Sequence, residues 1–159
     1  MRPHRFVGLA ILIFIAICSS TSGTGPLQFY SVAPCRMVDT RGMTGPYGGP
    51  AIVAGAYRAF PVFGQYAYPC GIPDTAKAIS INATIVGPSA NGYITIWANL
   101  APWPGTSNLN YNAGEPALAN GAIVKLTYPP NDLVNPNYQI QVTSGANLNL
   151  IIDITGYFQ

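Results

Sequence analysis

Histidine is missing from almost the whole chain. The 159-residue sequence holds one histidine, His4, which lies close to the N-terminus. Nucleophilic catalysis by serine or cysteine usually depends on a neighbouring histidine that acts as the base. A Ser-His-Asp or Cys-His arrangement is therefore excluded from the rest of the chain.

Charged residues are also scarce, at 8% of the sequence. Two of the seven basic residues, Arg2 and Arg5, lie at the N-terminus, and the remaining five balance the five acidic residues. A near-neutral chain without a basic patch lacks the electrostatic footprint of a nucleic-acid-binding protein, so we expect no nucleic-acid partner. Low charge also leaves little repulsion between copies of the protein.

Carboxylates are few, but glycoside hydrolysis needs only two of them. Their positions argue against that activity, because Asp39 lies between Arg36 and Arg41, a pattern that favours a structural ion pair. Asp74 follows a proline in a predicted turn. Asp153 lies on the polar side of an alternating segment. We therefore expect a protein that is not an enzyme and takes no cofactor.

The N-terminus has the order of a secretory signal peptide. Two arginines precede an uncharged apolar run over residues 6–18, and small residues follow at 19–23. The run is shorter than the roughly 20 residues of a membrane span. A retained anchor and a lipid-modified Cys18 are the alternatives. We expect a signal peptide over residues 1–22, a single extracellular domain over 23–159, and a secreted or cell-surface protein that meets the membrane only through its leader.

Cysteine is limited to Cys35 and Cys70 beyond Cys18. An exported chain with two remaining cysteines favours a disulfide between them, with two buried free thiols as the alternative. Two cysteines without histidine supply too few ligands for a zinc site. Oxygen-bearing side chains between Asn131 and Asn137 leave a calcium site as an alternative to a turn-rich loop.

Helical periodicity is also absent beyond the leader, and alternation takes its place. Between Cys70 and Gly87, isoleucine and alanine at 79, 81, 83 and 85 alternate with polar residues, which predicts a half-buried strand. Similar segments predict further strands at 27–32, 57–63, 93–99, 108–112, 122–127, 138–143 and 148–158. Asn91-Gly92 predicts a hairpin to the strand at 93–99, and Asn120-Gly121 predicts another turn. The fold class is all-β: an antiparallel β-sandwich, jelly-roll or Ig-like, with eight to nine strands and one disulfide.

Aromatic residues mark candidate binding surfaces. Tyr93 and Trp97 share the face opposite Ile94 and Ile96, and Trp103 follows in a proline-rich turn. Exposed rings beside amide side chains can stack on sugars, whereas an aromatic residue on a sandwich strand can equally pack in a second layer or an interface. Further candidates are Tyr57, Tyr66, Tyr68 and Tyr111.

Three spaced motifs carry a resemblance to a known family. They are PCRMVDTR at 34–41, CGIPDTAKA at 70–78 and DITGYF at 153–158. Together they resemble a bacterial extracellular β-domain family with the pattern PCRxxDTR, CGIPxTAKA and DxTGYF. The resemblance implies a non-catalytic surface module of a kind often appended to larger secreted proteins, and it supplies no catalytic residue. This chain departs from the family in its longer segment at 128–138 and in placing the domain directly behind the expected signal peptide.

The expected function is therefore structural. The uncharged segment with Leu27, Phe29, Tyr30 and Val32 is a candidate strand for donation to a neighbouring copy, which would build a homo-oligomer, filament or matrix. The alternative is a carbohydrate-binding module that recognises a surface polysaccharide through exposed tyrosine and tryptophan.

Overall fold

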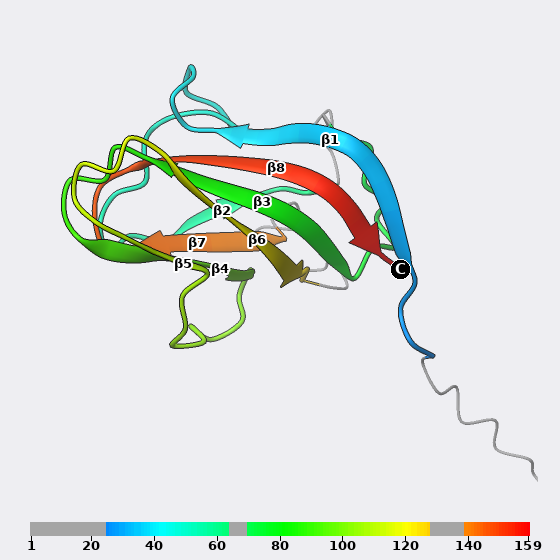
Figure 1. The fold of residues 1–159 in the computed structure, drawn as a ribbon. Coiled ribbons are helices and arrows are strands. Elements are labelled where there is room, and N and C mark those ends of the chain that lie inside the picture. Colours follow the sequence, from blue (N-terminus) through cyan, green and yellow to red (C-terminus); the bar gives the residue numbers. More distant parts are fainter. Residues whose placement is uncertain (1–24, 64–69, 128–138) are drawn as a thin grey trace, which may run out of the picture.

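The computed structural model describes residues 25–63, 70–127 and 139–159, and this part of the chain is built of β-strands without a helix (Figure 1). The strands are β1 (Phe29–Asp39), β2 (Arg58–Phe60), β3 (Ala78–Val86), β4 (Gly92–Ala98), β5 (Leu109–Tyr111), β6 (Leu118–Lys125), β7 (Ile140–Ser144) and β8 (Asn149–Phe158). The expected signal peptide, Tyr66, Tyr68 and the calcium alternative at 131–137 lie outside the described residues. Among the described residues, no helix could cross a membrane.

The eight described strands form two antiparallel sheets of four, in the orders β1-β8-β3-β6 and β2-β7-β4-β5. The pairing is nested, because β1 pairs with β8, β2 with β7, β3 with β6 and β4 with β5. This is the strand order of a jelly roll, in which a long folded-over chain wraps into two facing sheets. The predicted antiparallel sandwich is confirmed, and of its two forms the topology is the jelly roll.

The core lies between the sheets and is filled by aliphatic side chains from alternate strand positions. In β3 the predicted stripe of Ile79, Ile81, Ala83 and Ile85 is buried, with at most 2% of any of these side chains exposed. The facing sheet contributes β-branched residues from β4 and β7: Ile94, Ile96, Ile140 and Val142. Burial of such side chains is the main stabilising term of a sandwich.

Two turn predictions are wrong. Asn91-Gly92 does not close a hairpin, because β3 and β4 belong to different sheets. Both hydrogen-bonding edges of β3 are already taken by β6 and β8, so the chain crosses to the other sheet. Asn120-Gly121 lies inside β6, where Asn120 pairs with Ala83 and Gly121 with Asn82. Long-range pairing with β3 thus overrides the local preference of Asn-Gly for a turn.

The first strand is longer than predicted. The sequence predicted a strand only to residue 32, and Pro34 just beyond it cannot donate a backbone hydrogen bond. In the structure β1 continues to Asp39, and its register against β8 shifts between Ser31 and Cys35. This register shift accommodates Pro34 within β1. Because β1 is an edge strand, the missing N–H of the proline breaks no hydrogen bond to a further strand among those described.

Candidate functional sites

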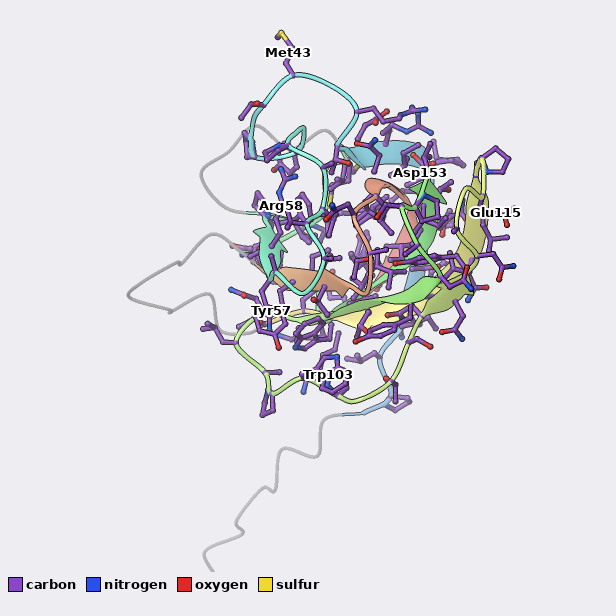
Figure 2. All side chains as sticks on the ribbon, turned by 90° about the vertical axis from the view of Figure 1, so that its left-hand side faces the viewer. Met43, Tyr57, Arg58, Trp103, Glu115 and Asp153 are labelled. Atoms are coloured by element: carbon purple, nitrogen blue, oxygen red, sulfur yellow. A yellow bond between two sulfur atoms is a disulfide. The ribbon has the colours of Figure 1, made fainter. Side chains whose placement is uncertain are left out.

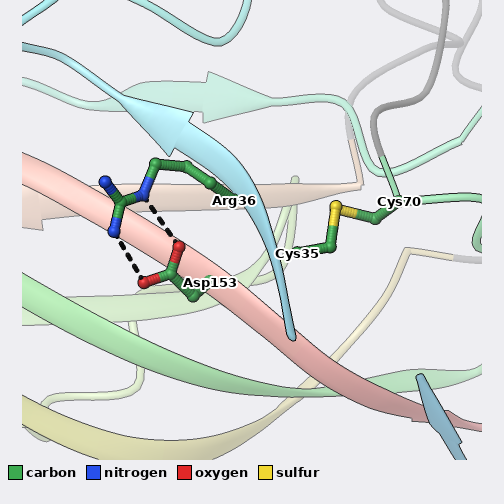
Figure 3. The surroundings of a disulfide bond; sticks show 4 residues. All are labelled: Cys35, Arg36, Cys70 and Asp153. Atoms are coloured by element: carbon green, nitrogen blue, oxygen red, sulfur yellow. Dashed lines mark hydrogen bonds and ion pairs between the residues drawn. A yellow bond between two sulfur atoms is a disulfide. The ribbon is translucent and has the colours of Figure 1, made fainter. Parts of the chain in front are cut away.

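The predicted disulfide is confirmed. Cys35 in β1 is bonded to Cys70, which begins the segment that leads into β3, with the two Cα atoms 5.5 Å apart (Figure 3). Cys70 also packs against the hydrophobic core. A disulfide is typical of proteins that fold in an oxidising, extracytoplasmic environment.

Four charged side chains meet on β1 and β8. Asp39 accepts two hydrogen bonds from the guanidinium of Arg41, at 2.8 and 2.7 Å. Arg36 reaches Asp39 at only 3.7 Å and instead makes a two-bond pair with Asp153, at 2.9 and 3.1 Å (Figure 3). The expected ion-pair neighbourhood thus exists, but the main partner of Arg36 is Asp153, which the sequence had placed only on a polar face.

The contacts within these pairs shift the pKa values of Asp39 and Arg36. The hydrogen bonds from the side chain of Arg41 lower the pKa of Asp39 below its ordinary value. The hydrogen bond to Asp153 raises the pKa of Arg36. Each carboxylate is therefore engaged by an arginine, which suits a structural role better than proton transfer. Within the described residues no three histidine, cysteine or acidic side chains cluster as metal ligands would.

A further arginine was missed by the sequence reasoning. The guanidinium of Arg58 lies 4.7 Å above the ring of Phe60 and donates hydrogen bonds to backbone carbonyls of the glycine-rich loop after β1, including those of Gly45 and Gly49 at 3.2 Å. It ties that loop to β2. The sequence shows a single basic residue at the start of a short strand, but its neighbouring residues do not indicate that it binds the loop after β1.

Trp97 is not an exposed platform, because only 7% of it is accessible. It lies on the outer face of β4, where Tyr57 meets it edge-on with ring centroids 5.6 Å apart. Its indole N–H donates to the carbonyl of Ala101, 2.9 Å away. Trp97 therefore packs beneath the loop over residues 99–108 and fixes that loop to the sheet.

Tyr93 and Trp103 do come together. They line an open cleft of about 190 Å³ with Gly105, Thr106, Ser107 and Asn110. Tyr93 and Asn110 are directly opposite one another on β4 and β5, and Trp103 comes from the loop between these strands. Figure 2 shows Trp103 on the side of the molecule opposite Met43, and 49% of its surface is exposed.

The proposed donor segment is paired inside its own chain. Phe29 and Tyr30 lie opposite Phe158 and Tyr157 of β8, with ring centroids 5.1 and 5.2 Å apart. Val32 is partly buried against the core, and Leu27 precedes the strand. This segment is thus paired within its own sheet, and its other edge has no strand partner among the described strands.

The backbone groups on the edge of β1 that faces away from β8 can be identified from the hydrogen-bonding pattern of the two strands. Gln28 and Gln159 exchange two backbone hydrogen bonds, at 2.8 and 3.0 Å. Because hydrogen-bonded and non-hydrogen-bonded pairs alternate in an antiparallel ladder, the backbone groups of Phe29 and Ser31 point away from β8. Among the described strands β8 alone pairs with β1.

Comparison of the chain with protein-family models, curated proteins and solved structures gave no match.

Proposed function

We propose that this protein is a non-catalytic, exported module of the bacterial surface-domain type described above, and that it joins copies of itself outside the cell. The observation that carries the proposal is the open N-terminal half of β1. Backbone N–H and C=O groups along such an edge are a ready template for a further strand. The proposed partner is a second copy of this chain.

The chemistry of this edge favours association. No charged residue occurs between Gly25 and Cys35. Leu27, Phe29 and Tyr30 are 48%, 51% and 42% exposed, so apolar surface accompanies the unpaired backbone. Proteins that avoid edge pairing usually place lysine, proline or a cover at such positions.

The remainder of β1 is guarded, which limits association to its first residues. Pro34 removes a donor. Beyond it, the backbone N–H of Asp39 donates to the carbonyl of Tyr47, 2.9 Å away, so the following loop covers that end. A second copy would therefore dock against residues 27–32. Pairing of two β1 edges gives a closed dimer, whereas pairing of β1 with a different edge gives a filament.

Light scattering and electron microscopy of the exported protein test the proposal. We expect the particle mass to increase with protein concentration, and Ser31→Lys to abolish the increase because a lysine on an edge strand opposes its pairing with a further strand. Phe29→Lys should act in the same way. Val53→Lys, at a position that is 57% exposed in a loop, is the matched control and should associate like the original protein.

A protein that stays monomeric at high concentration would contradict the proposal. So would association that Ser31→Lys and Val53→Lys leave equally strong, because the contact would then lie elsewhere. Thermal unfolding of each variant verifies that the substitution acts on association and not on folding.

A further inference from the structure

The cleft between β4, β5 and their connecting loop is a candidate ligand site because it brings two aromatic side chains together with polar ones. It lies on the outer face of the sheet β2-β7-β4-β5, whereas the edge proposed for association belongs to the other sheet. We propose that this cleft binds one ring of a neutral saccharide, with the ring stacked on Trp103.

The loop between β4 and β5, which supplies most of the lining of the cleft, is hydrogen-bonded to β4 at several points. Besides the indole of Trp97, the hydroxyl of Thr95 holds the loop by donating to the carbonyl of Thr106, 2.6 Å away. Asn108 accepts a hydrogen bond of 2.6 Å from the backbone N–H of Ile96. A site held from several points loses little conformational freedom when a ligand enters, which favours binding.

The lining combines two aromatic rings with free polar groups. The hydroxyls of Tyr93 and Ser107 and the amide of Asn110 make no hydrogen bond to any described residue, so they are available to a ligand. Convergent polar groups beside aromatic surface are the usual composition of a small-molecule site. A sugar matches both features, because its C–H faces suit the electron-rich face of a ring and its hydroxyls suit amide and hydroxyl partners.

Charge and size narrow the ligand class. The lining residues include no acidic or basic side chain, so an anionic or cationic sugar gains no ion pair with them. The cleft of about 190 Å³ is smaller than the roughly 300 Å³ at which pockets for drug-sized ligands begin. It therefore fits one ring of a longer polysaccharide, and its open form lets the rest of the chain continue outside.

The test is a glycan array followed by titration of the intact protein with the neutral oligosaccharide that binds best among glucan, mannan and chitin fragments. We expect Trp103→Ala and Asn110→Ala to weaken binding by roughly tenfold or more. Ile123→Ala is the matched control, since Ile123 is 66% exposed on β6 of the other sheet and lies outside the cleft. Sugar should also protect Trp103 from acrylamide quenching, whereas Trp97 is already buried.

Two results would overturn the inference. One is an array on which no neutral glycan binds. The other is glycan binding that Trp103→Ala leaves unchanged while thermal unfolding shows both proteins folded. The Ser31→Lys variant separates this site from self-association: it should retain sugar binding, and sugar binding without association would reject only the proposed edge contact.

Discussion

At the scale of single residues, the arginines of this protein act as clamps. Arg41 binds Asp39 and Arg36 binds Asp153, each with two hydrogen bonds. Arg58 donates hydrogen bonds to backbone carbonyls of the loop after β1. Arginine suits these tasks because its planar guanidinium donates in fixed directions and remains charged. Five of the twelve charged residues of the chain are thus engaged in holding β1, β8 and one loop.

We expect Asp39→Asn to lower stability at neutral pH and to lose this effect in acid. The pKa of Asp39 is lower in the folded protein than its ordinary value of 3.8, chiefly because Arg41 donates to it. A lowered pKa stabilises the fold at pH values above that of the unfolded carboxyl, and the contribution disappears as the pH falls through the folded value.

Thermal unfolding of both proteins between pH 7 and pH 2 measures the effect. The two melting temperatures should differ at neutral pH and converge at the acid end. A constant difference across the range would mean that the substitution acts through packing and not through the charge of Asp39. Association and sugar binding should survive the substitution at neutral pH, since the pair is structural.

The residue scale also shows what the sequence could and could not predict. Alternation was sufficient to place the aliphatic stripe of β3 in the core, and the count of two cysteines behind the expected leader was sufficient to pair Cys35 with Cys70. The partner of Arg36 was not predictable, since Asp153 lies 117 positions away and only the β1–β8 register brings them together. The sequence pattern could not show that Trp97 is buried and Trp103 exposed, because both depend on the position of the loop between β4 and β5.

At the scale of elements, pairing partners outweigh local preferences. Asn120-Gly121 reads as a turn but lies in a strand, since β3 offers hydrogen bonds along the whole of β6. Of the described strands that follow each other in sequence, only β4 and β5 pair. The sequence therefore indicates where strands occur far better than it indicates which strands meet.

The disulfide links two elements that the sheets alone leave apart. Cys35 lies in the edge strand β1, and Cys70 lies in the segment before β3, which is separated from β1 by β8. We expect replacement of both cysteines by serine to lower the free energy of unfolding by roughly 3–4 kcal/mol, because a closed loop of this length restricts the unfolded chain.

Chemical denaturation of the oxidised protein and of the double serine variant measures this difference. The original protein in reducing agent is the control and should match the variant. If removal of the disulfide leaves the free energy of unfolding unchanged, the pairing of β1 with β8 must hold the edge strand without covalent help.

At the scale of the whole molecule, a closed core coexists with an open edge. The two sheets bury their facing sides completely enough that Ile79, Ile85 and Ile152 have no exposed surface. The two proposed contact surfaces are the first residues of β1 and the cleft on the other sheet. The two proposed contacts lie on different sheets, so association through β1 would leave the cleft accessible to a saccharide.

Self-association also predicts a dependence of stability on concentration. A contact made only by folded copies favours the folded state by mass action, so the melting temperature should rise with protein concentration. Calorimetry at several concentrations measures this rise. The Ser31→Lys variant should show none, and a rise equal to that of the original protein would place the contact away from β1.

The nested order of the strands also governs when the protein can form. β8 is synthesised after all the other described strands, yet it is the neighbour of both β1 and β3 in the first sheet. A growing chain that has not reached residue 149 therefore leaves β1 without its partner and β3 with only one. The native pairing of the first sheet therefore cannot be completed until translation has supplied β8.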